Sequence, residues 1–277
     1  MMTKALIAFI LAREHIRLLR TQGKPKPWTQ DRILQRFRFT NIHREDDTVT
    51  RWIAANWRDA YAGHPDVWFA MVVARLFNWP PTLAHLTPVP FHPTKMVETI
   101  VELKSQRQKV YGGAYIVSTN GVAMGKVEYL MTRVLAPLWE DRKKLRPFKG
   151  QTLAAYHAAL LPYNGLGNFL AAQVIADLKY IEPLHSAVDW AAWAASGPGS
   201  RRGLNRVLGH KLDAPWNEVE WLAQLTALRA TVIAAIHPEP LHAQDLQNCL
   251  CEFDKYMRVK LGEGRPRATY PGGKNDS

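Results

Sequence analysis

Apolar residues recur at intervals of three and four along most of the chain, the spacing that gathers them on one face of an α-helix. Near the N-terminus, Ile7, Ile10, Leu11, Leu18 and Leu19 would form such a face, in a helix that stops at Gly23. The same periodicity predicts further helices over residues 46–62, 66–76, 152–157, 171–178, around 188–196, from 200 onward, 218–236 and 241–261. The pattern therefore predicts a mainly α fold.

One stretch, between Val110 and Tyr129, departs from helical spacing. Its β-branched and aromatic residues flank Asn120 and Gly121, a dipeptide that favours a two-residue hairpin turn. We expect a small β-ribbon or an extended loop there.

The elements predict one helical unit over residues 1–261, built as two lobes, with two helices joined by a short turn near 152–178. Residues 262–277 are predicted to form a flexible basic tail, because they combine glycine, proline and basic residues without helical periodicity. No internal repeat is evident.

The charge of the chain points to a polyanionic partner. The 277 residues include 36 Lys and Arg against 24 Asp and Glu, a formal net charge of +12. Residues 255–277 hold six basic and two acidic residues, so the rest of the chain is basic in its own right. Such a balance is typical of proteins that bind nucleic acid, and we expect double-stranded DNA as a partner.

Cysteine usage and hydropathy suggest where the protein works. Cys249 and Cys251 are one residue apart, too close to bridge readily and unlike a zinc-binding pair. No apolar run reaches the length of a membrane span, because Lys4, Arg13 and Glu14 interrupt the most apolar N-terminal segment. We expect a cytoplasmic protein, in the host cytoplasm if a phage encodes it, with no membrane partner.

Two glycines, Gly165 and Gly167, occupy a short turn between apolar runs in LPYNGLGNFLAAQVIADL (161–178). A dinucleotide-binding fingerprint would need a preceding strand, and the preceding segment has helical texture. A P-loop is also excluded, because in GVAMGKVE (121–128) the spacing is wrong and a valine follows the lysine. The remaining interpretations are a plain helix-helix turn or a phosphate-binding one.

This stretch resembles the helix-hairpin-helix of DNA repair enzymes, in which glycine amides at a helix N-terminus meet a DNA phosphate without reading sequence. The resemblance covers residues 152–193. It implies that the turn contacts DNA through Tyr163, Asn164, Gly165, Gly167 and Asn168.

Asp189 lies about twenty residues after the turn, where helix-hairpin-helix glycosylases carry a catalytic aspartate. The resemblance implies a catalytic role for Asp189; the alternative is that it caps the helix that follows. Phe169 occupies the place of the lysine that a glycosylase/lyase would use, so lyase chemistry is not expected.

Longer motifs carry a second resemblance. They are PWTQDRILQRFRFTNIHREDDTVTRWI (27–53), GAYIVSTNG (113–121), WAASGPGSRRGLNRVLG (193–209) and LQNCLCEFDKYMRVKLGEGRPRATYPG (246–272). These stretches resemble the phage thymine-hypermodification family. That family comprises the amino acid:DNA transferases, or α-glutamyl/putrescinyl thymine pyrophosphorylases, and the helical domain attached to 5-hydroxymethyluracil DNA kinases.

Membership would imply a helical, glycosylase-derived fold that acts on a base within DNA. In this family the kinases add phosphate and then pyrophosphate to 5-hydroxymethyldeoxyuridine, and the transferases replace the pyrophosphate with an amine. Because the chain lacks a P-loop, the resemblance favours the transferase, with a functional link to such a kinase. The donor would be an amino acid or a polyamine, with glycine slightly favoured.

Pyrophosphate release needs positive charge, and GPGSRRGLNR (197–206) offers it. Ser200 would cap a helix whose first amides face an anion, and Arg201 and Arg202 would add bidentate contacts. Lys126, Lys255 and Arg258 are weaker candidates of the same kind. The alternative is a basic loop that touches the DNA backbone.

For the base that accepts the amine proton, the candidates are Asp189 and Glu45. FTNIHRED (39–46) also gathers Asn41 and Arg44 beside Glu45, either as a site or as the start of a surface helix with structural ion pairs. Cys251 is a less favoured nucleophile, because direct displacement of pyrophosphate needs no covalent enzyme intermediate.

Two other functions stay open at this point. A monofunctional DNA glycosylase would use Asp189 without a lysine, and a non-catalytic DNA-binding subunit would partner a kinase. No metal-ligand constellation stands out, and no cofactor is evident, although a divalent cation could bridge pyrophosphate and carboxylates.

Overall fold

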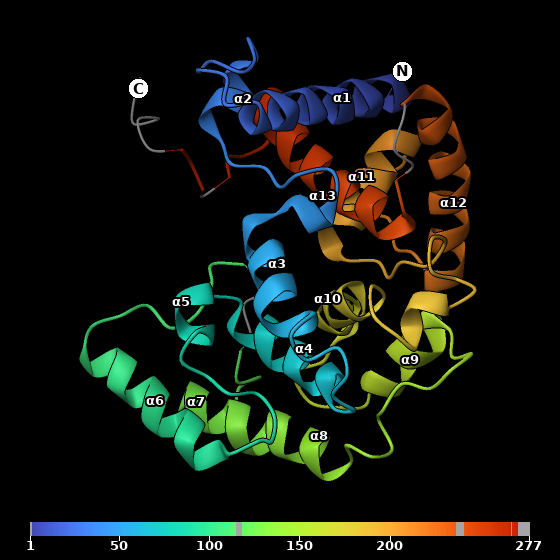
Figure 1. Ribbon diagram of the computed structural model, residues 1–277. Helices are drawn as coiled ribbons and strands as arrows, with labels where there is room; N and C mark the ends of the chain where they lie inside the picture. The colour runs from blue at the N-terminus through green and yellow to red at the C-terminus, as the bar shows by residue number, and fades with distance from the viewer. Residues whose placement is uncertain (1, 115–117, 237–240, 267, 271–277) are drawn as a thin grey trace. The chain divides into compact units, whose positions relative to one another are not determined.

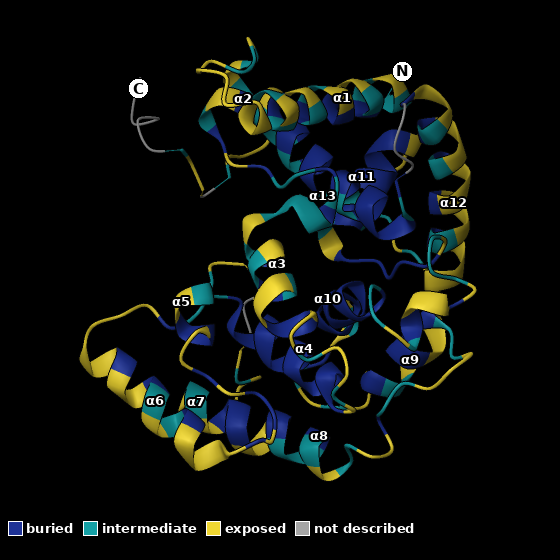
Figure 2. Cartoon of the chain, in the orientation of Figure 1, coloured by how far each residue is buried: buried dark blue, intermediate teal, exposed yellow. Residues whose placement is uncertain are grey.

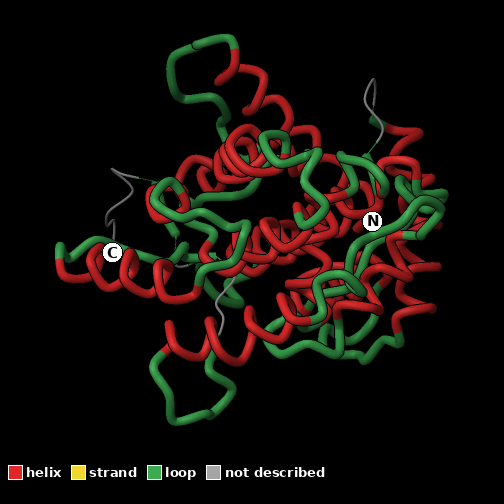
Figure 3. Tube along the Cα trace, turned by 60° about the horizontal axis from the view of Figure 1, so that its bottom comes forward, coloured by secondary structure: helices red, strands yellow, loops and turns green. Residues whose placement is uncertain are grey.

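The computed structural model describes residues 2–114, 118–236, 241–266 and 268–270, and these form helices and loops without a named strand (Figures 1 and 3). The predicted mainly α fold is confirmed. No β-ribbon is present in residues 110–114 and 118–129, and residues 115–117 lie outside the described ones. Asn120 and Gly121 do turn the chain, with φ of 52° and 79°, but the turn joins loops rather than strands.

The chain divides into two compact units. The discontinuous unit combines Met1–Asp47 with Ala191–Ser277, and the central unit is Thr48–Trp190. The helices of the discontinuous unit are α1 (Met2–Thr21), α2 (Arg32–Arg36), the 3₁₀ turn η1 (Arg44–Asp46), α11 (Pro198–Leu208), α12 (Glu218–Ala235) and α13 (Ala243–Lys260).

The helices of the central unit are mostly short. They are α3 (Thr48–Ile53), the π-helical turn η2 (Ala54–Arg58), α4 (Val67–Phe77), α5 (Pro80–Leu83), α6 (Pro93–Ser105), α7 (Lys126–Tyr129), the π-helical turn η3 (Leu130–Leu135), α8 (Ala136–Glu140), α9 (Leu153–Leu160), α10 (Asn168–Leu178) and the 3₁₀ turn η4 (Leu184–Ser186).

The close approach of α11 to α13 organises the discontinuous unit. A Cβ atom on Gly203 would lie 2.2 Å from the Leu250 carbonyl oxygen, and one on Gly199 would lie 2.3 Å from Cys251 Sγ. Glycines four positions apart therefore create a flat stripe on α11 that admits the backbone of α13. Around this contact, α1, α12 and α13 bury a common apolar core that includes Leu6, Trp221 and Phe253.

The buried face of α1 agrees only in part with the predicted one: Ile10 is buried and Ile7 packs against the core, as expected. Leu11 and Leu18 are 45% and 41% exposed, whereas Leu6 and Ile16 are buried. The reason is Arg13, which lies on the buried face and donates hydrogen bonds to the carbonyls of the segment before η1. Because Arg13 occupies a buried position, the apolar residues alone do not mark the buried face of α1.

In the central unit, every residue of α4 is buried, and α10 packs against it (Figure 2). Arg75 on α4 and Asp177 on α10, each 1% exposed, form a two-pronged ion pair with N–O distances of 2.6 and 2.5 Å. Such a pair fixes the register of two helices, because removing one partner would leave a buried charge.

Some predicted boundaries were wrong. The helix predicted over residues 46–62 is shorter and spans 48–58, where α3 runs directly into the π-helical turn η2, and residues 188–196 form turns and irregular chain instead of a helix. The helix predicted from Ser200 begins at Pro198. Among the described residues, none of the helices has the length and apolar character to cross a membrane.

Candidate functional site

The N-terminus of α11 uses Ser200 internally. The Gly197 amide donates a 3.0 Å hydrogen bond to Ser200 Oγ, and this hydroxyl in turn donates to the Gly197 carbonyl. Ser200 is fully buried, three residues inside the cap. Its role in the structure is to close the first turn of the helix on itself.

Arg201 is held by the start of α12. Its Nε donates to Ser196 Oγ at 2.6 Å, and its Nη2 lies 2.5 Å from Glu218 Oε1. Burial alone would raise the pKa of Glu218, but hydrogen bonds from Ser196 and Arg201 bring this pKa below its ordinary value. Arg201 therefore ties α11 to α12 through an ionised carboxylate.

Arg202, the next residue, faces α13 instead. Its Nε lies 3.2 Å from Asp254 Oδ2, and Arg258 Nε lies 3.4 Å from the same oxygen. Arg206 approaches the other oxygen, Oδ1, with Nη2 at 3.0 Å. Three guanidiniums thus surround one buried carboxylate, and we call Arg202, Arg206 and Arg258 around Asp254 the arginine cluster.

The arginine cluster presents unused donors to solvent. Arg202 and Arg258 approach Asp254 through Nε, and their side chains are 38% and 39% exposed. No described residue accepts a hydrogen bond from their terminal Nη groups. Arg206 is buried and also binds Glu263, whose hydrogen bond raises the pKa of Arg206. Two acids against three arginines leave a net positive site that can bind an anion bidentately.

Sequence reasoning missed Arg206 and ranked Arg258 low. The signal lies in two spacings of four, Arg202 with Arg206 and Asp254 with Arg258, which place each pair on one helix face. Lys255 does not join this group: its Nζ lies 2.6 Å from Glu252 and 4.7 Å from the Phe39 ring.

The motif FTNIHRED is fastened to α13. The Thr40 amide donates to Glu252 Oε2 at 3.1 Å, and the Arg44 amide donates to Asp245 Oδ1 at 3.0 Å. The Asn41 side chain donates to the Asp46 carbonyl at 2.8 Å. The structure thus joins residues 40–44 to α13, with backbone amides as the main link.

Within this motif, Arg44 is buried and Glu45 half-buried, both in η1. Next to η1, burial raises the pKa of Asp47 to about 6, despite a hydrogen bond from the Asn41 amide. This carboxyl changes protonation state near neutral pH.

Both cysteines are poor nucleophiles in this setting. Burial raises the pKa of Cys251 to about 11, and the pKa of Cys249 well above its ordinary value. A thiol with so high a pKa is protonated at neutral pH. Within the described ranges, no three His, Cys, Asp or Glu residues lie together as metal ligands.

In the central unit, α9 and α10 form two helices joined by the predicted glycine turn. Gly165 has φ of 80°, and a Cβ there would lie 3.0 Å from both Val134 methyl carbons. Gly167 is the N-cap of α10, and a Cβ there would meet nothing within 4 Å. His157 Nε2 lies 2.9 Å from the Asn168 carbonyl, linking α9 to the first turn of α10.

The other residues of the turn differ in exposure. Asn164 is exposed, whereas Tyr163 is half-buried and donates its hydroxyl to Asp141. Burial, together with this hydrogen bond, raises the pKa of Tyr163 to about 12. The Tyr163 ring is therefore anchored to the segment that follows α8.

Asp189 caps α9, a helix earlier in the chain rather than the one predicted to follow it. Its two carboxylate oxygens accept hydrogen bonds from the amides of Leu153 at 2.8 Å and Ala154 at 3.0 Å. An anion at this position also interacts favourably with the helix dipole.

A buried lysine that the sequence did not indicate holds the segment of Asp189. Lys179, directly after α10, is 2% exposed; its Nζ donates to the Trp190 carbonyl at 3.1 Å and lies 4.2 Å from the Trp190 ring. The Trp190 indole donates back to the Lys179 carbonyl. This exchange fixes residue 190 against the end of α10 and so positions its neighbour Asp189.

Comparison with known proteins places the chain in a family. The family model that matches is the helical domain of 5-hmdU DNA kinases, over residues 1–265. A 5-hmdU DNA kinase of Bacillus phage SP10 is 26% identical over 211 residues, which cover 67% of this chain and 33% of that kinase. The chain thus spans about a third of this relative. No solved structure matches. The chain belongs to the family of 5-hmdU DNA kinase helical domains.

Proposed function

We propose that this member of the 5-hmdU DNA kinase helical-domain family is a transferase that hypermodifies thymine in DNA. Its substrate would be 5-pyrophosphoryloxymethyl-deoxyuridine in duplex DNA. The bond between the exocyclic methylene and the pyrophosphate oxygen breaks, and a carbon–nitrogen bond to an amino acid or polyamine forms. The amine proton passes to a base, and pyrophosphate leaves.

The observation that carries this proposal is the arginine cluster. Pyrophosphate leaves with a large negative charge. Its departure is accelerated by cations that are already fixed at the position where this charge develops. Asp254 holds Arg202 and Arg258 by Nε and so leaves their outer nitrogens available for two phosphoryl groups. The reaction needs no nucleophile from the protein, in keeping with the raised pKa of Cys251.

The turn between α9 and α10 would hold the DNA backbone. It packs on Val134 and Asp141, which lie in a basic segment of the central unit. Residues 133–149 contain six Lys and Arg and only two acids. Amides of a helix N-terminus beside such a segment suit phosphate contacts that carry no sequence information.

We propose two candidates, Asp189 and Glu45, for the carboxylate that accepts the proton of the amine. Asp189 already accepts two amide hydrogen bonds, which suits it to offset positive charge as the methylene develops cation character. Asn41 and Arg44 would support Glu45. A divalent cation could assist at the pyrophosphate, where substrate oxygens would supply ligands.

The test is mass spectrometry of nucleosides after incubation with duplex DNA that carries 5-pyrophosphoryloxymethyl-deoxyuridine. The donors are glycine, other amino acids and putrescine, supplied together with and without Mg²⁺. A new nucleoside whose mass equals thymidine plus one donor, less two hydrogens, is expected. Loss of the base would instead identify a glycosylase.

A second function is favoured by the comparison itself. Because the family model that matches is the helical domain of a 5-hmdU DNA kinase, the chain could bind the DNA on which a kinase domain acts. Unchanged nucleosides in the transferase assay, with tight binding to the same duplex, would support this function instead.

A further inference from the structure

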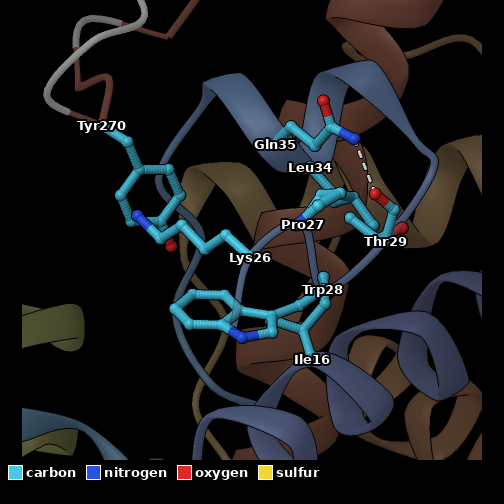
Figure 4. A pocket seen from close by; sticks show the side chains of 8 residues that line it. All are labelled: Ile16, Lys26, Pro27, Trp28, Thr29, Leu34, Gln35 and Tyr270. Atoms are coloured by element: carbon cyan, nitrogen blue, oxygen red, sulfur yellow. Dashed lines mark hydrogen bonds between the residues drawn. The ribbon is translucent and has the colours of Figure 1, made fainter. Parts of the chain in front are cut away.

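A small aromatic pocket lies in the discontinuous unit, beside α2. The volume of this pocket is about 180 Å³. Pockets that enclose drug-sized ligands are larger, with volumes of ~300 Å³ or more. This smaller space suits a single ring system. The pocket is lined by Ile16, Lys26, Pro27, Trp28, Thr29, Leu34, Gln35 and Tyr270 (Figure 4).

Cations surround the two aromatic rings of this pocket. Lys26 Nζ lies 5.2 Å from the Trp28 ring and 5.7 Å from the Tyr270 ring, and Figure 4 shows its side chain between them. The Arg20 guanidinium lies 5.6 Å from the Trp28 ring, and that of Arg38 lies 5.7 Å from the Tyr270 ring. Aromatic faces with flanking cations are the combination that binds a base and its phosphate.

The walls of the pocket are held in place by hydrogen bonds. The Trp28 indole donates to the Lys24 carbonyl at 2.7 Å, and Gln35 Nε2 donates to the Thr29 carbonyl at 2.6 Å. The Tyr270 amide donates to the Arg36 carbonyl at 3.0 Å, next to a β-bridge between Phe37 and Thr269. The Trp28 ring and the backbone of Tyr270 are therefore held in place before any ligand arrives.

The surroundings of the pocket carry a strong positive charge. Residues 17–38 contain seven Lys and Arg against one acid, Asp31. Asp31 is used within the fold, since it caps α2 and accepts the Tyr256 hydroxyl at 2.7 Å. A second hollow beside α2 is lined by further arginines, Arg32, Arg36 and Arg265. A polyanionic chain could follow this face past the pocket.

We propose that the Trp28 pocket binds one unstacked nucleotide of a DNA strand, with its base against Trp28 and its phosphates near Lys26, Arg20 and Arg38. None of the residues that line it belongs to the arginine cluster, so the pocket is a further DNA contact and not the pyrophosphate site. The inference rests on DNA as the substrate in the proposed function, but not on the transfer reaction.

The test compares two unmodified, fluorescently labelled duplexes, one fully paired and one with a single unpaired thymidine, by fluorescence anisotropy. Trp28→Ala is expected to weaken binding of the unpaired form by about five- to 100-fold, as loss of one base–aromatic stack implies. Trp28→Phe should retain most of the affinity. Trp79→Ala is the matched control, because Trp79 also carries a lysine, Lys109, at 4.1 Å from its ring but does not line this pocket.

Photo-cross-linking locates the contact even if an alanine variant folds poorly. With 5-iododeoxyuridine at the unpaired position, the intact protein should yield an adduct on Trp28 or Tyr270. Adducts only at other residues would overturn the inference, and so would an equal loss of affinity for both duplexes in the Trp28→Ala variant. Competition by free dTMP at the same concentration as the duplex would also overturn it, because the pocket would then bind a free nucleotide and not a DNA strand. If neither duplex binds, the inference fails, whereas the proposed function is decided separately by mass spectrometry of nucleosides from the modified duplex.

Discussion

At the scale of residues, adjacent arginines have different tasks, and this difference can be measured. Arg202 presents its outer nitrogens beside Asp254, whereas Arg201 is occupied by Ser196 and Glu218. We expect Arg202→Ala to lower kcat by on the order of 100-fold, the cost of removing one fixed donor from developing charge. Binding to duplex DNA should change little, and single-turnover kinetics with pre-bound substrate would measure the step.

Arg201→Ala is the matched control for that experiment. It removes the same charge one position away, and its exposed ion pair with Glu218 contributes only about 0–1 kcal/mol to stability. Equal losses of kcat in the two variants would show that general positive charge, not the arginine cluster, drives the reaction.

The raised pKa of Asp47 predicts that the stability of the folded protein depends on pH. Its pKa in the folded protein is about 6, against about 3.9 for an unfolded chain. Between these values the folded state keeps a proton that the unfolded state has lost. The contribution of Asp47 to the free energy of unfolding is therefore fully present below about pH 4 and is lost as the pH rises through 6, by up to about 3 kcal/mol.

Asp47→Asn keeps an oxygen for the Asn41 amide and removes the charge. Urea denaturation at pH 4.5 and pH 7.5 should show the variant close to the wild type at the lower pH and more stable at the higher one. Asp46→Asn serves as the control at the neighbouring position. A variant that is less stable than the wild type at pH 7.5 would contradict the prediction.

Residue chemistry could be predicted only where neighbours in the sequence were also neighbours in space. The arginines after Gly197 were visible in the sequence as candidate anion ligands, and Arg202 does belong to the arginine cluster around Asp254. The partners of each arginine were not visible, because Asp254 lies 52 positions from Arg202. The burial of Ser200 and Lys179 likewise depends on tertiary packing that no local pattern encodes.

At the scale of elements, the glycine stripe of α11 sets the position of the arginine cluster. In an isolated helix, Gly→Ala stabilises by about 1 kcal/mol. Gly203→Ala should do the opposite, because its Cβ would lie 2.2 Å from a backbone oxygen of α13 that cannot move aside. We expect a loss of about 1–3 kcal/mol, measured by thermal or urea unfolding.

Gly199→Ala offers an internal check on that explanation. A Cβ on residue 199 would lie 2.3 Å from Cys251 Sγ, whereas the next nearest atom, Cys251 Cβ, would be 3.3 Å away. The severe clash is therefore with the sulfur atom of a side chain. Cys251→Ala should therefore recover much of the stability that Gly199→Ala loses, whereas it should not rescue Gly203→Ala. Equal rescue of both variants would show that the stripe is not a close backbone contact.

Helices were easier to predict than their faces and ends. The 218–236 helix was predicted almost to the residue, because its caps are local: Asn217 accepts from the Glu220 amide at 2.8 Å. The predicted face of α1 was wrong at Leu11 and Leu18, because Arg13 lies inside the core and donates hydrogen bonds to backbone carbonyls there. The helix around 188–196 was wrong because Asp189 and Trp190 instead bond to the ends of α9 and α10.

At the scale of the molecule, the discontinuous unit joins the beginning and the end of the chain. Glu252 meets Thr40 across 212 positions, and Asp245 meets Arg44 across 201. Two of the four stretches that carried the family resemblance, residues 27–53 and 246–272, are therefore joined in one structural feature. Periodicity indicates which segments are helices, but such distant pairings appear only in the fold.

The overall charge yields the last prediction, on DNA affinity and salt. Each phosphate that a lysine or arginine neutralises releases counterions, so the logarithm of affinity falls with the logarithm of salt concentration by about 0.9 per phosphate. Replacing the exposed Lys24, Arg32 and Arg38 by glutamine should lower this slope by about 3 if each contacts one phosphate, and all three lie in the basic stretch of residues 17–38. The control replaces Lys95, Lys104 and Arg107, also exposed, and changes the net charge equally. If both variants lower the slope alike in salt titrations, net charge alone, and not the basic face of residues 17–38, attracts the DNA.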